Sequence, residues 1–410
     1  MTMAADKQDK VLNVPTLRFS EFKDDWNDYH LRDLCTFHSG GTPSIDNVEY
    51  WEGEIPFVSA VAMHNTHIEK TPLTLTEKGL RDGSKQLEAG NLLLLVRGSM
   101  LWNKIPICYN DVDVAFNQDV KGIVPNSKTT SLFLLNWIQS HENRIKYMVT
   151  GTGIGAGKLD SEDLLALNVK LPSLIEQKKI EKFLSLIDER IETQIRIIDK
   201  LQSLMKGLND YLQDFVPLSY SLSFSDIGED YSGLSGKSAE DFGSGKPYIT
   251  YVSIYANNFV EDDCCGKVSV KRNEKQNVVQ KGDMLFTLSS ETPEEVCYGA
   301  VYSGNSTETY LNSFCFGIRN TEGKVFSPYM AYFFNSNRFR REVYPLAQGS
   351  TRFNLQKSDF LQKHFSYPSI DDQHRIFEIL NAYDNKLKVE NQILVHYQHQ
   401  KEFLLRNLFI

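Results

Sequence analysis

The chain has 410 residues, of which 41% are hydrophobic and 24% are charged, and its formal net charge is −9. This length allows two or three domains with real cores, and the composition is that of a globular protein and not of a disordered one. The negative charge argues against a broad basic surface that binds nucleic acid, because such binding depends on neutralising phosphates. Any contact with DNA must therefore be local, or shared with partner proteins.

Neither membrane insertion nor secretion is expected. The longest apolar run, NLLLLV at 91–96, is too short to cross a bilayer, and the first ten residues lack the apolar segment of a signal peptide. The six cysteines form no C-x-x-C pair and no cluster with zinc-ligand spacing. We therefore expect a cytoplasmic protein with reduced, mostly structural thiols and with neither a metal nor a cofactor.

In chain order, the first predicted element is a module of short strands. Its segments are rich in Val, Ile, Phe and Tyr and are broken by Gly and Pro, and an amphipathic helix is expected after them at 131–148. A glycine-rich stretch at 151–160 follows, and a long helix begins after Pro172. The same order then returns, with strands, a helix at 327–344 and a second long helix after Pro368. The chain is therefore predicted to contain two mixed α/β modules, each with a helical tail.

The glycine-rich stretch, GTGIGAGKLD, is not a phosphate-binding P-loop. Thr152 stands where that motif needs its first glycine, and Leu159 stands where it needs Ser or Thr. A dinucleotide fingerprint fits Gly151, Gly153 and Ala156, but only a short segment follows, ending at Pro172. We interpret the stretch as a flexible loop, either a structural turn or a segment that contacts the DNA backbone.

The two halves of the chain are copies of one ancestral unit, because residues 158–191 align with residues 354–387. Upstream the match is weaker but keeps its order: IPFVSAVAM resembles KPYITYVSI, and NQDVKGI resembles NSFCFGI. Identical pairs include Leu159 and Leu355, Asp163 and Asp359, Pro172 and Pro368, Gln177 and Gln373, Ile180 and Ile376, Asp188 and Asp384, and Gly90 and Gly282.

Each tail carries an apolar seam with alternating steps of four and three residues. A seam of 3.5-residue period is typical of helices that pair in a coiled coil, whereas a helix packed only on its own module usually has a wider stripe. Antiparallel pairing is expected, and a helix of roughly 35 to 40 residues would span ~50 to 60 Å and hold the modules at opposite ends. The seam residues are Ile180, Leu184, Ile187, Ile191, Ile198, Leu201, Met205, Leu208 and Leu212, then Ile376, Leu380, Tyr383, Leu387, Leu394, Tyr397, Leu404 and Leu408. Gln194 and Glu390 interrupt it at equivalent places, and Lys401 replaces Met205.

The motifs together resemble the specificity subunit of type I restriction-modification enzymes, over almost the whole chain. The residues that carry this resemblance are LPSLIEQKKI and YPSIDDQHRI at the tail openings, QGSTRFNL at 348–355, GKSAEDFG with YITYVSIY, and VPTLRFSEF with Trp26.

The resemblance implies an α/β (mixed α+β) fold with two globular target recognition domains, at 1–172 and 216–368. Two long conserved helices, at 173–215 and 369–410, would separate these domains and form an antiparallel coiled coil with a pseudo-twofold internal repeat. It further implies a non-catalytic subunit that reads a bipartite asymmetric sequence in double-stranded DNA. Its partners would be two methyltransferase subunits and the restriction subunits, which are helicase-nucleases.

Candidate DNA contacts are polar or basic residues on loops after buried strands and near the two glycine-bearing turns. Asn117 and Gln118 supply amides able to pair with adenine, and an arginine such as Arg352 can reach a phosphate or a guanine edge. Ala156 occupies the place of Arg352 in the first module, so a shared role of the two turns is in doubt. For the other candidates, a solvated turn or helix face is the alternative interpretation. They are Arg97, Ser99, Asn103, Lys104, Lys158, Ser289, Ser290, Asn312, Ser313, Arg338, Arg340, Arg341 and Thr351.

Catalysis finds little support in the sequence. No Pro-Pro pair occurs, so the Asn/Asp-Pro-Pro-aromatic motif of an adenine methyltransferase is absent, and no spacing of Asp, His and Ser favours a triad or a two-metal site. The leading hypothesis is a DNA-specificity subunit. The alternatives are a coiled-coil scaffold without DNA sequence preference and a divergent enzyme that binds S-adenosylmethionine.

Overall fold

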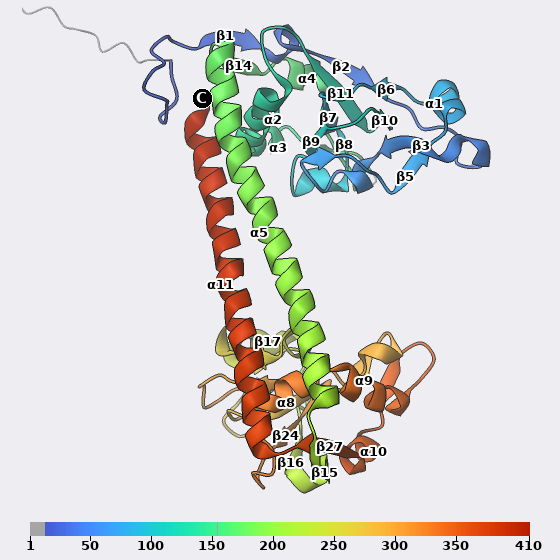
Figure 1. Cartoon of the computed structure of the whole chain (residues 1–410), viewed down its shortest axis with the longest axis vertical. Coiled ribbons are helices and arrows are strands. Elements are labelled where there is room, and N and C mark those ends of the chain that lie inside the picture. The colour runs from blue at the N-terminus through green and yellow to red at the C-terminus, as the bar shows by residue number, and fades with distance from the viewer. Residues whose placement is uncertain (1–12, 154) are drawn as a thin grey trace, which may run out of the picture. The chain divides into compact units, whose positions relative to one another are not determined.

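The computed structural model describes residues 13–153 and 155–410, and Figure 1 shows the chain. The first ten residues, which were predicted to lack a secretion signal, lie outside the described residues, and so does Ile154 of the glycine-rich stretch. The chain divides into two compact units. Unit 1 comprises Met1–Gln194 and Ile393–Ile410, and unit 2 comprises Ile195–Gln392.

Unit 1 contains four small sheets built from short strands. The central sheet has the order β2-β11-β7-β9-β4, and the others have the orders β5-β3-β10-β6, β12-β13-β8 and β1-β14. The strands are β1 (Asn27–His30), β2 (Cys35–Ser39), β3 (Trp51–Val58), β4 (His67–Ile68), β5 (Leu73–Leu75), β6 (Gln86–Leu87), β7 (Leu92–Leu95), β8 (Arg97–Gly98), β9 (Ile107–Asn110), β10 (Val114–Phe116), β11 (Val120–Pro125), β12 (Thr150–Gly151), β13 (Gly157–Lys158) and β14 (Asn168–Leu171). The apolar run at 91–96 is the central strand β7, whose four leucines are all buried.

Unit 2 repeats this plan, except that its counterpart of the four-stranded sheet β5-β3-β10-β6 has three strands. Its central sheet has the order β16-β24-β20-β22-β18, and the others have the orders β19-β17-β23, β21-β26-β25 and β15-β27. The strands are β15 (Leu218–Ser223), β16 (Glu229–Ser232), β17 (Phe242–Ile249), β18 (Phe259–Val260), β19 (Cys265–Val268), β20 (Met284–Thr287), β21 (Ser289–Ser290), β22 (Gly299–Tyr302), β23 (Tyr310–Leu311), β24 (Cys315–Arg319), β25 (Ala347–Gln348), β26 (Phe353–Leu355) and β27 (His364–Pro368). The predicted duplication is confirmed.

One pair of equivalent glycines shows how closely the copies agree. Gly90 and Gly282 both have φ +89°, a left-handed conformation that favours glycine. Each donates its N–H to the carbonyl of a neighbouring strand, Asn110 in unit 1 and Tyr302 in unit 2, at 2.8 Å. The same turn therefore opens the central strand in both copies.

Short helices cover the sheets. Two helices that were predicted to be continuous are each divided in two. Instead of single helices at 131–148 and 327–344, the structure has two short helices in each place. Ser336 causes the second break, because its Oγ accepts from the N–H of Phe339 and caps a new helix. The short helices are α1 (Glu77–Gly83), α2 (Ser131–Ser140), α3 (Glu142–Lys146), α4 (Ser161–Leu165), α6 (Phe224–Ile227), α7 (Tyr251–Ala256), α8 (Ser327–Phe333), α9 (Asn337–Val343) and α10 (Lys357–Gln362).

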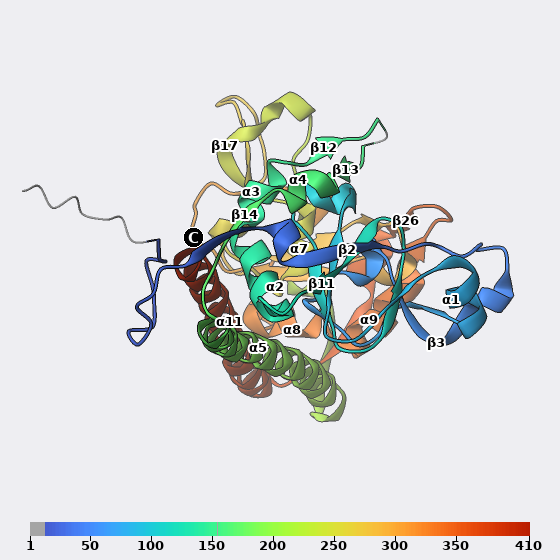
Figure 2. The ribbon, with the colours of Figure 1, turned by 90° about the horizontal axis from the view of Figure 1, so that it is seen from above.

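The two tails are long helices, α5 (Leu174–Phe215) and α11 (Ile370–Leu408), and each unit contains one part of each. Figure 1 and Figure 2 show them side by side. In unit 1 the beginning of α5 and the end of α11 belong to one core, and in unit 2 the end of α5 packs with the beginning of α11. The pairing is therefore antiparallel in both units, as predicted. No helix among the described residues is long and apolar enough to cross a bilayer.

The predicted seam is buried or half-buried along both helices, except at Tyr383, which is 37% exposed. Near the modules the buried stripe is wider than a coiled-coil seam. Leu405 and Phe409 are buried beside Leu404 and Leu408, and the Phe409 ring lies 5.3 Å from the ring of Phe133 in α2. The helices thus pack on their own modules as well as on each other.

Each long helix is anchored near its start by a fully buried glutamine. The Gln177 amide donates to the carbonyls of Pro172 and Lys128 and accepts from the Thr129 hydroxyl at 3.0 Å. The equivalent Gln373 donates to the carbonyl of Pro368 at 3.0 Å and accepts from the Phe326 N–H at 2.8 Å. The repeated glutamine therefore fixes the helix to the loop that precedes α2 or α8.

All six cysteines are free thiols. Burial raises the pKa of Cys35, Cys108 and Cys315 to about 12, so these thiols stay protonated at neutral pH. This agrees with the structural role that was predicted for them.

Candidate nucleic-acid interface

The glycine-rich stretch forms the β12–β13 hairpin, and the second glycine-bearing segment forms the β25–β26 hairpin. Each hairpin pairs with the short strand that follows the central strand of its unit, β8 in unit 1 and β21 in unit 2. The predicted equivalence of the two segments is thus confirmed. The helix after the first hairpin, α4, has only five residues, so the dinucleotide-binding arrangement of strand, glycine loop and long helix is not present there.

In unit 1 the hairpin brings together two of the predicted DNA contacts. Arg97 of β8 is the cross-strand partner of Lys158 of β13, and residues paired in this way project on the same face of a sheet. Arg97 is exposed, and its guanidinium has no hydrogen bond or ion pair among the described residues. The Lys158 ammonium lies 3.7 Å from the Asp160 carboxylate. Trp102, which is 48% exposed, donates to the Gly155 carbonyl at 3.0 Å and holds the hairpin. The result is a cationic pair beside an exposed indole.

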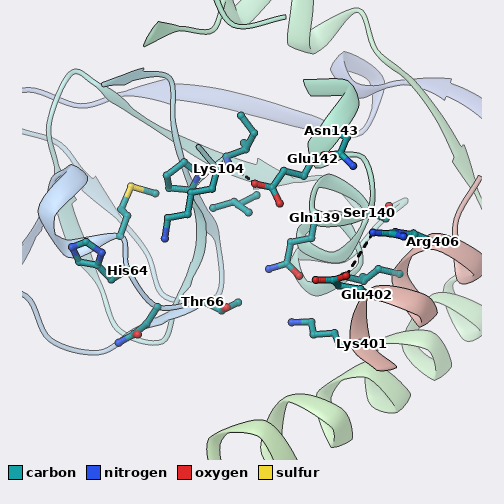
Figure 3. Close-up of a pocket in the computed structure, with 16 residues that line it drawn as sticks. His64, Thr66, Lys104, Gln139, Ser140, Glu142, Asn143, Lys401, Glu402 and Arg406 are labelled. Carbon is teal, nitrogen blue, oxygen red and sulfur yellow. Dashed lines mark hydrogen bonds and ion pairs between the residues drawn. The ribbon is translucent and has the colours of Figure 1, made fainter. Parts of the chain in front are cut away.

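The other unit 1 loop candidates are exposed on the segment after β8. Ser99 lies in a 3-10 helix, Ser99–Trp102, and the carbonyl of Asn103 accepts from the Lys146 ammonium at 2.7 Å. Lys104 lines a pocket of about 540 Å³ between the module and the last turns of α11, which Figure 3 shows. Glu142 and Glu402 line the same pocket, so its charge is mixed and does not favour a phosphate.

Asn117 and Asn312 occupy equivalent turns and have equivalent bonds. The N–H of Asn117 donates to Val58, and that of Asn312 donates to Ile249, both at 3.0 Å. Each side-chain oxygen accepts from the backbone two residues on, at Asp119 and Phe314. Because a bidentate contact with adenine uses the same amide oxygen, the geometry favours a turn-forming role for these residues over the predicted readout role.

Gln118 lines a mainly apolar pocket of about 690 Å³ in unit 1, together with Asn117. Its amide oxygen accepts from the Thr42 hydroxyl at 2.7 Å. Ile45 and Val48, on the wall of the same pocket, are 77% and 83% exposed. The sequence interpretation did not find these apolar residues, since isolated exposed aliphatic side chains give no local signal.

Four of the unit 2 candidates gather around a pocket of about 370 Å³. They are Ser289, Ser290, Asn312 and Arg352, and Tyr251, Tyr255 and Phe314 supply aromatic walls. The Arg352 guanidinium lies 5.6 Å from the centroid of the Phe314 ring. Ser313 and Thr351 are exposed beside these residues, on the same two loops. All three aromatic residues lie in segments that the sequence had indicated, Tyr251 and Tyr255 in YITYVSIY and Phe314 in NSFCFGI, although none of them was named as a candidate contact.

Two arginines of the predicted cluster on α9 form hydrogen bonds within unit 2. Arg338 donates to the carbonyls of Gln213 and Ser366, and Arg340 donates to those of Cys297, Glu294 and Val296. Burial also lowers the pKa of Arg340. These two guanidiniums satisfy backbone carbonyls inside unit 2, an arrangement that favours a structural role over a phosphate contact. Arg341 remains 72% exposed and pairs with Asp214 at 3.6 Å.

Comparisons with known proteins agree on one family. The model of the type I restriction modification DNA specificity domain matches twice, at residues 23–203 and 225–396, and the chain therefore belongs to this family. The EcoR124I/EcoR124II specificity subunit of Escherichia coli is 28% identical over 215 residues, which cover 51% of this chain and 53% of that protein. The MjaVIII specificity subunit of Methanocaldococcus jannaschii is 23% identical over 94% of this chain and 92% of its own length.

Solved structures show the same fold. The S subunit of a type I restriction-modification system from M. genitalium has a TM-score of 0.55 at 16% identity, and the match covers 97% of this chain and 99% of that one. A chain from a structure that describes complex assembly and conformational transition of the type I R-M system has a TM-score of 0.59 at 14% identity, covering 94% and 97%. At these identities the similarity establishes the architecture alone.

Proposed function

We propose that this protein is the specificity subunit of a type I restriction-modification system and reads a bipartite, asymmetric DNA sequence. The observation that carries the proposal is the double match to the specificity-domain family, once in each half of the chain. Each match covers one copy of the duplicated module, so one module reads each half of the target. The family match favours this function over the coiled-coil scaffold.

The two copies differ where they would meet DNA, which supports an asymmetric target. The cross-strand pair Arg97 and Lys158 of unit 1 corresponds to Ser289 and Asn354 of unit 2. Two cations suit phosphates, whereas a hydroxyl and an amide suit base edges. The modules would therefore use different chemistry on their half-sites.

The proposed partners are double-stranded DNA, two methyltransferase subunits and the restriction subunits. In this assembly the chain itself catalyses no reaction. The net charge of −9 supports shared binding, because a chain of this charge needs cationic partners to hold a duplex firmly. The exposed faces of α5 and α11, which include Leu204 at 62% and Phe403 at 60% exposure, offer apolar surface for the methyltransferase subunits.

The test is the pattern of modified adenines in a host that expresses the complete system with and without this chain. We expect methylation at one bipartite motif that disappears when the chain is deleted. An unchanged pattern of methylation would refute the proposal. Binding of S-adenosylmethionine by the purified chain alone would favour the divergent enzyme.

A further inference from the structure

The unit 2 pocket contains a buried hydroxyl without a protein partner. Ser289 is 4% exposed, and its Oγ has no hydrogen bond within the described part of the chain. The backbone of the same residue is fixed, because its carbonyl accepts from the Tyr251 hydroxyl at 2.8 Å and β21 pairs with β26. Burying a polar atom without a hydrogen-bond partner costs free energy. The Ser289 hydroxyl is buried in this way on a fixed backbone, and this points to a ligand that would bind it.

The neighbouring polar groups are mostly occupied by one another. Glu295 accepts from the Tyr255 hydroxyl at 2.7 Å and from the Ser290 hydroxyl at 3.0 Å. These hydrogen bonds lower the pKa of Glu295, so its carboxylate is charged at neutral pH. Glu291 is a second carboxylate in the lining. Two acidic groups beside a single arginine make the pocket a poor site for a phosphate.

Among the described residues, four polar side-chain groups of the lining have no hydrogen bond: the Ser289 hydroxyl, the Arg352 guanidinium, the Glu291 carboxylate and the Asn312 amide nitrogen. Arg352 and Ser289 are the two that supply a donor fork and a hydroxyl. Among the residues that the structure describes, Arg352 has no hydrogen bond or ion pair, and its one ring contact is with Phe314. A guanidinium presents N–H donors in a fixed fork, and a serine hydroxyl both donates and accepts. Guanine is the base whose major-groove edge carries two acceptors, O6 and N7, for such a fork.

We propose that this pocket receives a guanine of the half-site read by unit 2, with Arg352 donating to O6 and N7 and Ser289 adding a hydrogen bond from the pocket wall. The aromatic rings of Tyr251, Tyr255 and Phe314 would line the space around the base. This inference rests on the proposed function and specifies its recognition chemistry in the second module.

The experiment uses the full chain in complex with its methyltransferase subunits and selects bound duplexes from a randomised library. Arg352→Lys keeps the charge and removes the fork, so we expect the preference for guanine at one position of one half-site to fall about tenfold, the size of one good base contact. Ser289→Ala should weaken the preference at the same position about fivefold without lowering the Tm of the complex, because the hydroxyl has no partner among the residues that the structure describes.

The matched control for base preference is Arg272→Gln. Ser290→Ala serves as the comparison for stability alone: Ser290 donates to Glu295, so its loss should lower the Tm, unlike the loss of the Ser289 hydroxyl. Arg272 is exposed in the same unit and is not part of the lining of this pocket, so its variant should leave the motif unchanged.

An unaltered motif with Arg352→Lys and Ser289→Ala overturns the inference. So does an equal loss of affinity for all sequences, which indicates a phosphate contact, or a change at a position that is not guanine. A wild-type complex without any sequence preference refutes the proposed function itself, before any variant is compared.

Discussion

Asp188 of α5 and Lys401 of α11 form an ion pair of 2.6 Å between the two long helices of unit 1. Lys401 occupies a seam position where the other copy has Met205, and its side chain is 16% exposed. Asp188 lies early in α5 and Lys401 lies late in α11, so the pair joins the helices in their antiparallel register. A cation in an apolar seam favours the register that supplies its partner.

This pair predicts a coupling that a double-mutant cycle measures. Lys401→Ala and Asp188→Ala should each lower the free energy of unfolding, with an interaction of about 1 kcal/mol between them. Lys401→Met should cost less than Lys401→Ala, since methionine fills the same seam position in the other copy. Strict additivity of the two alanine variants in urea unfolding would contradict the role of the pair.

The buried glutamines predict a large loss of stability that is the same in both copies. Gln177→Ala leaves the Thr129 hydroxyl and the carbonyls of Pro172 and Lys128 without a partner, so the expected cost is about 2 to 3 kcal/mol. Gln373→Ala should cost a similar amount. Gln202→Ala, on the exposed face of α5, is the control, and we expect less than about 0.5 kcal/mol for it. Thermal unfolding of the three variants compares them directly.

The cationic pair of unit 1 predicts a change in the salt dependence of DNA binding. Arg97→Gln and Lys158→Gln should each weaken binding by the complex to all sequences alike and reduce the salt slope by about 1, as loss of a phosphate contact does. The motif should not change. Lys70→Gln, an exposed lysine elsewhere in the module, should keep the slope. An altered base preference in the first half-site would assign these residues to base readout.

Glu181 predicts a dependence of stability on pH. Burial raises its pKa to about 7, against a value of 4.5 in the unfolded chain, and Thr130 donates a hydrogen bond to its carboxyl group. Between these two values the folded protein holds a proton that the unfolded chain has released, so stability falls as pH rises from about 4.5 to about 7. Glu181→Gln should flatten this decline and stabilise the protein above pH 7. Glu189→Gln, which changes an exposed residue of the same helix, is the control and should leave the decline of stability with pH unchanged.

The buried arginine of α9 predicts a structural defect. Arg340→Met removes donors from three carbonyls and should cost about 2 to 3 kcal/mol of stability. Arg341→Met, three-quarters exposed, should cost less than about 0.5 kcal/mol. If both variants kept wild-type stability while DNA binding fell, the predicted phosphate role of the cluster would be restored.

The sequence by itself determined the duplication, the two long helices and their seam. These are properties of spacing: the copies repeat residues such as Gln177 and Gln373 in order, and the seam recurs at a period that only paired helices satisfy. It also located the two glycine-bearing segments, although their form as hairpins on β8 and β21 became visible only in the structure.

Only the tertiary structure decided which polar side chains are free to bind. Arg338 and Arg352 look alike in the sequence, yet Arg338 donates to Gln213, 125 residues away, whereas Arg352 has no such partner in the described part of the chain. Likewise Ser289 and Ser290 are neighbours in the sequence. The Ser289 hydroxyl has no hydrogen-bond partner among the described residues, whereas the Ser290 hydroxyl donates to Glu295. The physical reason is that the periodicity of a helix and its seam is a local property of the sequence. Whether a side-chain donor finds a hydrogen-bond acceptor depends instead on distant segments that meet only when the chain folds.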